Sequence, residues 1–105
     1  YLSPGVATPT EAFAALAEGA DVLKMFPAAQ MGPAVVKAWL AVLPAGTRLI
    51  PVGGITPDNM QVFLDAGVSG FGLGSGLFKP GLSPAEVAVR AKAYMQAWNA
   101  RRQAD

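Results

Sequence analysis

Hydrophobic residues follow two different spacings along the chain. Three short apolar runs, "DVLKMF" at 21–26, "RLIPV" at 48–52 and "GFGLG" at 70–74, each lead into a turn rich in glycine or proline. Such runs are typical of buried strands. Between them, apolar residues recur every three or four positions, which is typical of helices with one buried face. Three such stripes are predicted: Val36, Leu40 and Leu43; Met60, Phe63 and Leu64; and Val87, Ala91, Tyr94 and Trp98.

Helix starts are marked four times, by "TPTE", "GPAV", "TPDN" and "SPAE". Proline suits the first helical position because the amide that it lacks would have no partner there. We expect Thr8, Thr56 and Ser83 to cap the helices that follow them. Glu11 follows Thr8, and Glu86 follows Ser83, at the spacing of a capping box. In each pair we expect the side chain of either residue to accept a hydrogen bond from the backbone amide of the other.

Strand, loop and helix follow one another four times, with Gly19 and Gly67 where helix ends are expected. This order is typical of a parallel sheet with helical crossovers. Four βα units suit half of a (β/α)8 barrel or a small open sheet. Glycines and unusual residues gather in the strand-to-helix loops, as on the active face of a barrel, so we predict an α/β half-barrel. The expected elements are a strand end at 1–3, helix 9–18, strand 21–26, helix 33–42, strand 48–52, helix 57–66, strand 69–73 and helix 84–100.

Composition narrows the class of protein. The 105 residues are 52% hydrophobic and 14% charged, which is enough apolar material for one domain with a core. The net charge is +1, and positive residues adjoin only at Arg101 and Arg102, so neither nucleic acid nor a membrane surface is an expected partner. The opening "YLSPG" looks like the end of a strand that began earlier. We therefore expect residues 1–105 to be a fragment or a processed piece of a single barrel.

Two missing residue types limit the chemistry. The chain has no cysteine, which excludes disulfides and thiolate catalysis and is compatible with a cytoplasmic location. It has no histidine, which excludes a Ser-His-Asp triad and histidine-ligated metals. No apolar run has the length of a membrane span.

Lys24 stands in the middle of an apolar run. Side chains alternate along a strand, so Val22, Lys24 and Phe26 are predicted on one face, with Leu23 and Met25 on the other. Facing the barrel interior near its mouth, the amine could meet a substrate. Desolvation there would lower the pKa of Lys24, and a neutral amine can attack a ketone to form a Schiff base. A structural lysine paired with a buried carboxylate remains an alternative.

Two glycine-rich segments follow strands. In "VGGIT" at 52–56 and "GLGSGLF" at 72–78, bare amides can approach an anion closely. Gly74 and Ser75 offer amides and a hydroxyl, and a helix beginning after Thr56 would add a favourable dipole at the first segment. Phosphate commonly binds at such loops in barrels. The alternative is that these glycines only form tight turns. Neither segment fits a P-loop or a dinucleotide fingerprint.

The motifs "LKMFPA", "PVGGI" and "GLGSGLF", together with "PGVATPTEA", resemble the 2-keto-3-deoxy-6-phosphogluconate and 2-keto-3-deoxy-6-phosphogalactonate aldolase family. The resemblance spans nearly the whole chain and implies the second half of a (β/α)8 barrel, usually assembled as a trimer. It implies that Lys24 forms a Schiff base with pyruvate and that Phe26 and Pro27 shape the pyruvate pocket. The iminium is the electron sink, so no metal or other cofactor is implied.

The resemblance also bears on the substrate. Galactonate-type members have "PVGGI" and gluconate-type members "PTGGI", so Val52 before Gly53 and Gly54 favours cleavage of 2-dehydro-3-deoxy-6-phosphogalactonate to pyruvate and D-glyceraldehyde 3-phosphate. The gluconate epimer is the alternative substrate. A non-catalytic phosphate-binding half-barrel and a thiamin phosphate synthase relative are the alternative functions.

The family's general acid/base glutamate and an arginine are expected in a missing N-terminal half. Glu11, Glu18 and Glu86 belong to helix starts or ends and are not assigned that role. We expect the chain to dimerise, to aggregate or to need that half, because four units alone leave sheet edges open and an apolar face exposed.

Overall fold

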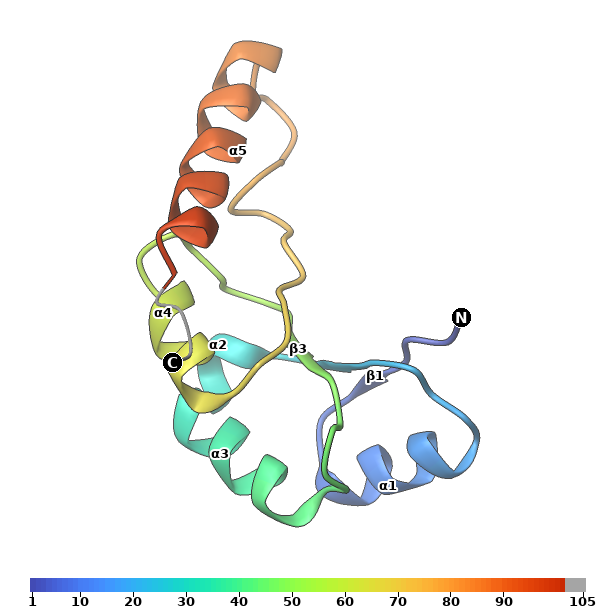
Figure 1. The fold of residues 1–105 in the computed structure, drawn as a ribbon. Coiled ribbons are helices and arrows are strands. Elements are labelled where there is room, and N and C mark those ends of the chain that lie inside the picture. Colours follow the sequence, from blue (N-terminus) through green and yellow to red (C-terminus); the bar gives the residue numbers. More distant parts are fainter. Residues whose placement is uncertain (102–105) are drawn as a thin grey trace.

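A computed structural model describes residues 1–101 of the chain. Residues 102–105, which include Arg102 of the predicted basic pair, lie outside the described part. Each strand of the described chain is followed by one or two helices, and α5 extends from α4 as an arm (Figure 1). The elements are β1 (Gly5–Val6), α1 (Pro9–Ala17), β2 (Leu23–Met25), α2 (Ala28–Met31), α3 (Pro33–Val42), β3 (Leu49–Pro51), α4 (Met60–Ala66) and α5 (Pro84–Asn99).

The strands form a parallel sheet in the order β1-β2-β3, as the repeated strand and helix pattern predicts. Lys24 stands between Gly5 of β1 and Ile50 of β3 in the register. Beyond β3, a single parallel bridge joins Val52 to Gly72. Each connection between these strands carries a helix, which is the crossover that parallel neighbours require.

Two predicted strands differ from the structure. The first strand is Gly5–Val6 and not 1–3, although the carbonyls of Leu2 and Pro4 accept bonds from residues before and within β2. Proline has no amide to give to a ladder, so regular pairing begins only after Pro4. The predicted strand 69–73 is reduced to the bridge at Gly72. Alternating glycines at 70, 72 and 74 supply no side chains to pack, which weakens a strand.

Several helix ends follow the predicted caps. The Thr8 side chain accepts the Glu11 amide at 3.1 Å, and Ser83 and Glu86 form the complete capping box of α5. Gly67 ends α4 with φ of 111°. No helix within residues 1–101 combines the length and the apolar character needed to cross a bilayer.

The start of the third predicted helix is wrong. The Asn59 side chain accepts the Thr56 amide at 2.9 Å, and α4 begins only at Met60, with residues 57–59 in a turn. Thr56 therefore caps nothing, because Asn59 occupies the cap position. The short helix α2, which follows Pro27, was not predicted.

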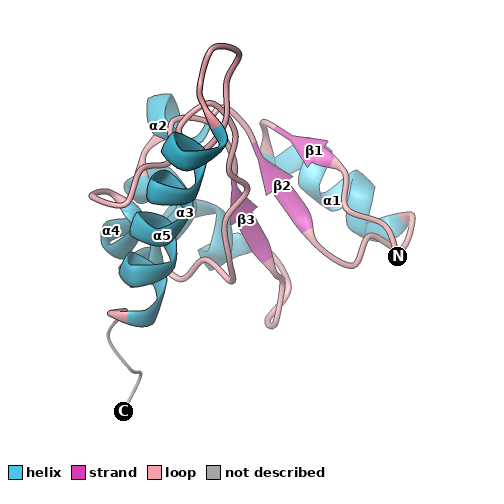
Figure 2. Ribbon diagram, turned by 90° about the horizontal axis from the view of Figure 1, so that it is seen from above, coloured by secondary structure: helices cyan, strands magenta, loops and turns pink. Residues whose placement is uncertain are grey.

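The core lies on one face of the sheet. Leu23, Met25 and Leu49 are fully buried between the strands and the helices, and the predicted stripes of α3 and α4 contribute Val36 and Phe63. Figure 2 views the sheet from above and shows β1 and β2 with no helix in front of them. The opposite face of the sheet is therefore open within the described chain.

Candidate functional site

Lys24 lies on this open face. Its neighbours Leu23 and Met25 have 0% exposure, whereas Lys24 is exposed, so strand alternation separates them as predicted. Val22, which was predicted to share the face of Lys24, is instead buried at 5% exposure and precedes the strand. The backbone of Lys24 is fixed by its amide, which donates to the Pro4 carbonyl at 2.9 Å.

The segment after β2 is tied to the segment after β3. Phe26 is 56% exposed, and its ring lies against Gly53, where an added Cβ would meet ring carbons at 3.0 Å. After the half-buried Pro27, the Ala28 amide donates to the Val52 carbonyl at 2.9 Å. These contacts place Phe26 beside the first predicted phosphate loop.

The first phosphate loop is defined here as residues 52–56. Val52 has the strand parity of Ile50, which is the register partner of Lys24, so Val52 and Lys24 share the open face. Gly53 and Gly54 have φ of 102° and 71°, a region that favours glycine. Within residues 1–101, no atom accepts a hydrogen bond from either glycine amide. Both amides are thus available to an anion.

The second phosphate loop is defined as residues 72–78. The Gly74 carbonyl accepts the amides of Leu77 and Phe78, at 2.9 and 3.0 Å, which makes one helical turn. The amides of Gly74 and Ser75 have no acceptor in the described chain, and both residues are exposed. This loop is therefore a second source of free amides, with the Ser75 hydroxyl beside them.

The two loops touch. A Cβ on Gly76 would lie 3.1 Å from the Ile55 carbonyl oxygen, so only glycine allows this approach. A Cβ on Gly72 would lie 2.5 Å from Val52, which shows the same close packing at the base of the loops. The predicted site residues thus lie on β2 and in the segments that follow β2, β3 and the bridge at Gly72, at the carboxyl ends of parallel strands, which is the functional end of barrel sheets.

The carboxylates of Glu11, Glu18 and Glu86 belong to helix starts or ends. Glu11 accepts the Ala7 amide at 2.9 Å, and Glu86 completes the capping box of α5. Glu18 is the exposed C-cap residue of α1. Among residues 1–101 no three acidic, cysteine or histidine side chains gather as metal ligands. The site thus offers an amine and hydrogen-bond donors, and these three carboxylates belong to helix ends.

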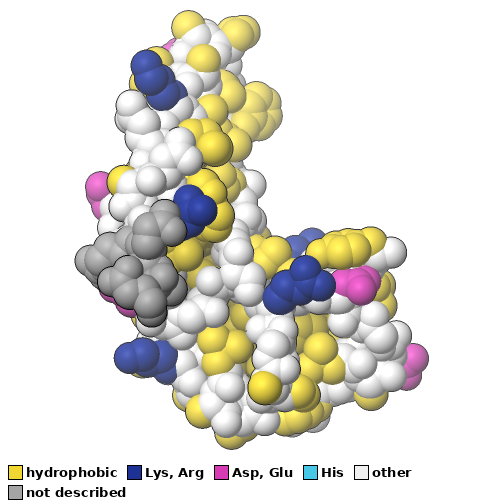
Figure 3. Space-filling model, viewed as in Figure 1, with side chains coloured by type: hydrophobic (Ala, Val, Ile, Leu, Met, Phe, Trp, Pro, Cys, Tyr) yellow, Lys and Arg dark blue, Asp and Glu magenta, His cyan; other side chains and the backbone are white. Residues whose placement is uncertain are grey.

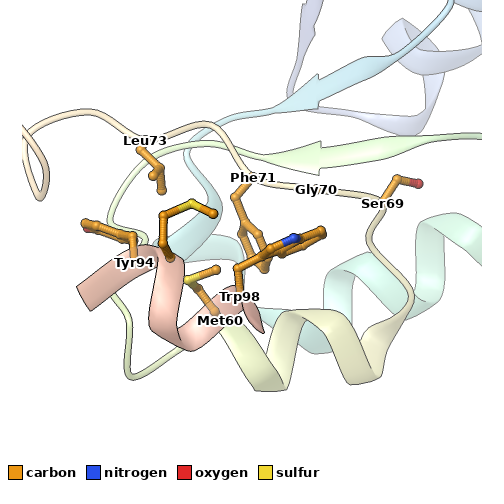
Figure 4. A pocket seen from close by; sticks show the side chains of 8 residues that line it. Met60, Ser69, Gly70, Phe71, Leu73, Tyr94 and Trp98 are labelled. Carbon is orange, nitrogen blue, oxygen red and sulfur yellow. The ribbon is translucent and has the colours of Figure 1, made fainter. Parts of the chain in front are cut away.

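A cavity of about 320 Å³ between α5, α4 and the segment 69–73 adjoins the second phosphate loop at Leu73 (Figure 4). It is largely apolar and does not include Lys24. Figure 3 shows hydrophobic side chains gathered along the arm formed by α5 and the segment before it. The lining residues are Met60, Ser69, Gly70, Phe71, Leu73, Tyr94, Met95 and Trp98.

Lys24 thus lies on a parallel α/β sheet whose strands lead into loops with free amides. The chain belongs to the KDPG and KHG aldolase family, whose sequence pattern matches residues 1–89. This confirms the family resemblance.

The relatives agree with this assignment. The chain is 47% identical, over 95 residues, to the 2-dehydro-3-deoxy-6-phosphogalactonate aldolase of Escherichia coli. That match covers 90% of this chain and 46% of the relative, so the chain spans about half the relative's length. A solved structure titled "Native KDPGal structure" superposes with a TM-score of 0.90 at 46% identity, over 92% of this chain and 47% of that one.

The alternative family shares only the fold. A thiamine phosphate pyrophosphorylase from Pyrococcus furiosus superposes with a TM-score of 0.74 at 22% identity, over 92% of this chain and 48% of that one. The chain therefore has the predicted α/β barrel-type fold, covering a part of a barrel.

Proposed function

We propose that the chain carries the Schiff-base lysine and the phosphate site of an aldolase that cleaves 2-dehydro-3-deoxy-6-phosphogalactonate. The products are pyruvate and D-glyceraldehyde 3-phosphate. The observation that carries the proposal is the placement of Lys24 on the open sheet face, with Val52 on the same face and free amides just beyond it. The similarity to relatives named for this substrate supports it.

The amine of Lys24 attacks the C2 ketone of the substrate, and loss of water gives an iminium. The bond between C3 and C4 then breaks, and its electrons pass to the iminium nitrogen to form an enamine. The proton of the C4 hydroxyl leaves to a base as the aldehyde forms. Protonation of the enamine and hydrolysis release pyruvate and restore the amine. Phe26 and Pro27 border the pyruvate end of this site.

The two phosphate loops bind the phosphate of the substrate. Free amides at Gly53, Gly54, Gly74 and Ser75 donate to its oxygens, and the Ser75 hydroxyl adds a further donor. Bonds from amides to a charged acceptor are about twice as strong as neutral ones. The helix dipole expected after Thr56 is not part of the proposal, since α4 begins at Met60.

Val52 selects the epimer. Its methyl groups lie on the face of Lys24 and beside Gly72, between the amine and the phosphate loops. A valine accepts no hydrogen bond from the C4 hydroxyl, so it favours the epimer whose hydroxyl points elsewhere. The phosphogluconate epimer is the alternative substrate.

The open face and the acid/base step require further groups. We propose that residues 1–105 form half of one barrel, that an N-terminal half covers the open face and supplies the glutamate and arginine, and that the complete protein is a cytoplasmic homotrimer. Two findings support the missing half: the relative is about twice as long as the matched region, and one sheet face is uncovered.

Borohydride trapping tests the proposal. This chain, fused after the first half of the Escherichia coli relative, is incubated with pyruvate and reduced, and the adduct is located by peptide mass mapping. We expect the adduct on Lys24. Lys24→Arg should abolish it, because guanidinium stays protonated, and the exposed Lys37→Arg should leave it unchanged.

Three outcomes separate the alternatives. An adduct on another lysine, or none in a folded fusion, contradicts the Schiff-base role. Phosphate binding without an adduct favours a non-catalytic phosphate-binding half-barrel. Equal cleavage of both epimers contradicts the assignment of the galactonate substrate while leaving the aldolase intact.

A further inference from the structure

Tyr94 of α5 places its hydroxyl group among buried hydrophobic residues. The residue is 4% exposed, and its hydroxyl donates to the Ile55 carbonyl, 39 positions away in the sequence, at 2.5 Å. Burial raises the pKa of Tyr94, and the Arg90 guanidinium opposes this as the smaller influence. The hydroxyl therefore remains a protonated donor at neutral pH, and it holds the first phosphate loop to α5.

The same hydroxyl also touches the second phosphate loop. A Cβ on Gly76 would come within 2.1 Å of the Tyr94 oxygen, so Gly76 lies directly against it. One turn earlier on α5, the Arg90 guanidinium donates to the Gly76 carbonyl at 3.1 Å and is partly buried. Helix α5 thus holds both loops by hydrogen bonds from two polar side chains, Arg90 and Tyr94.

The spacing of these loops decides whether they act as one anion site. Charge-assisted bonds from amides to oxygen form at about 2.7–2.9 Å, so two loops serve one phosphate only when their separation is fixed. Asn59 already holds the Gly54 carbonyl at 2.9 Å within the first loop. The bridge between Val52 and Gly72 joins the bases of the two loops, and beyond it the bonds that connect the loops within residues 1–101 run through α5.

We infer that Tyr94 and Arg90 are positioning residues that fix the two phosphate loops relative to each other, so that both bind one phosphate group. The inference rests on the proposed phosphate site. It gives α5 a role in substrate binding although neither side chain touches the substrate. Tyr94 and Arg90 raise the affinity of the loops for phosphate, in addition to any contribution that they make to folding.

The test is a titration of the fused enzyme described above with inorganic phosphate, in which amide chemical shifts report binding. In the wild type, amides of both loops should shift with one common Kd. Tyr94→Phe, which keeps the ring, and Arg90→Met should each weaken phosphate binding by about three- to tenfold, the factor expected for one lost hydrogen bond. Shifts are read from folded-state signals, so a loss of stability alone does not change the Kd.

Two matched controls accompany these variants. Tyr1→Phe removes a hydroxyl from a residue that is 92% exposed, and Lys92→Met removes a positive charge from an exposed position of α5. Neither should change the Kd by as much as twofold. Arg90→Lys, which keeps a donor and a charge, should recover part of the affinity that Arg90→Met loses.

Each outcome decides a different point. A folded Tyr94→Phe and Arg90→Met that bind phosphate like the wild type overturn the inference and leave the phosphate site standing. Two loops that titrate with different Kd values in the wild type also overturn it, whether or not the variants fold. A folded wild-type fusion in which neither loop responds to phosphate contradicts the proposed phosphate site itself.

Discussion

Gly54→Ala gives a direct measure of how tightly the first phosphate loop is packed. Gly54 has φ of 71°, and an added Cβ would lie 2.4 Å from the Cβ of Ala29. The left-handed backbone should cost about 1–2 kcal/mol for a residue with a Cβ. Forcing a methyl group into occupied space should cost about 1–3 kcal/mol more. The free energy of unfolding should therefore fall by about 2–5 kcal/mol.

Two further variants separate these costs. Gly19 has φ of 90°, and an added Cβ there meets nothing within 4 Å, so Gly19→Ala should carry only the backbone cost of about 1–2 kcal/mol. Ala29→Gly removes the atom that Gly54→Ala would strike. In that background, the cost of Gly54→Ala should fall to the value measured for Gly19→Ala.

The assay is urea unfolding of the chain and its variants, followed by far-ultraviolet circular dichroism and tryptophan fluorescence. A cost of Gly54→Ala no greater than that of Gly19→Ala would contradict the close contact between Gly54 and Ala29. An unchanged cost of Gly54→Ala in the Ala29→Gly background would also contradict it, because the close contact between α2 and the loop would then be absent.

Three other perturbations test separate parts of the structure. Ser83→Ala should lower the free energy of unfolding by about 0.5–2 kcal/mol through loss of the α5 capping box, and Ser69→Ala, at an exposed serine, is its control in the same urea titration. Because burial raises the pKa of Tyr94, the folded state favours the neutral phenol; its stabilisation is complete below the unfolded pKa of about 10 and is lost as pH rises through the folded value. Above about pH 10, the free energy of unfolding should thus fall more steeply in the wild type than in Tyr94→Phe. Tyr1→Phe should follow the wild type. Parallel curves for all three proteins would contradict this prediction. In the fused enzyme, Val52→Thr should shift the ratio of kcat/KM for the galactonate and gluconate epimers toward the latter by about ten- to a hundredfold, and an unchanged ratio would show that Val52 only packs.

Local patterns predicted most of the fold. Prolines at helix starts, the Ser83 cap and the apolar stripe of α3 depend on residues close in sequence, and helix 33–42 has the bounds of α3. The face of Lys24 was predictable because strand side chains alternate with period two. The family followed from motifs in register, and the sequence comparison confirms it.

The sequence-based predictions are wrong where residues distant in the sequence, or competing neighbours, determine the local structure. Thr56 was predicted to cap the helix, but Asn59 takes the cap position and α4 begins only at Met60. The 69–73 segment has apolar residues for a strand, but its pairing is limited to one bridge with Val52. The hydrogen bond from Tyr94 to Ile55 joins residues 39 positions apart in the sequence. The sequence showed only that a residue with a hydroxyl group stands in an apolar helical stripe.

The presence of a lysine in the apolar strand β2 has a structural explanation in two parts. The strand is buried on one face only, and Lys24 takes the other, so the described chain does not force its ammonium into the core. Residues 1–101 leave Lys24 exposed on that face. If the chain alone is trapped by pyruvate and borohydride as readily as the fused enzyme, the covering half is unnecessary for nucleophilicity. If trapping needs the fusion, the open face is where the missing half completes the active site, as proposed.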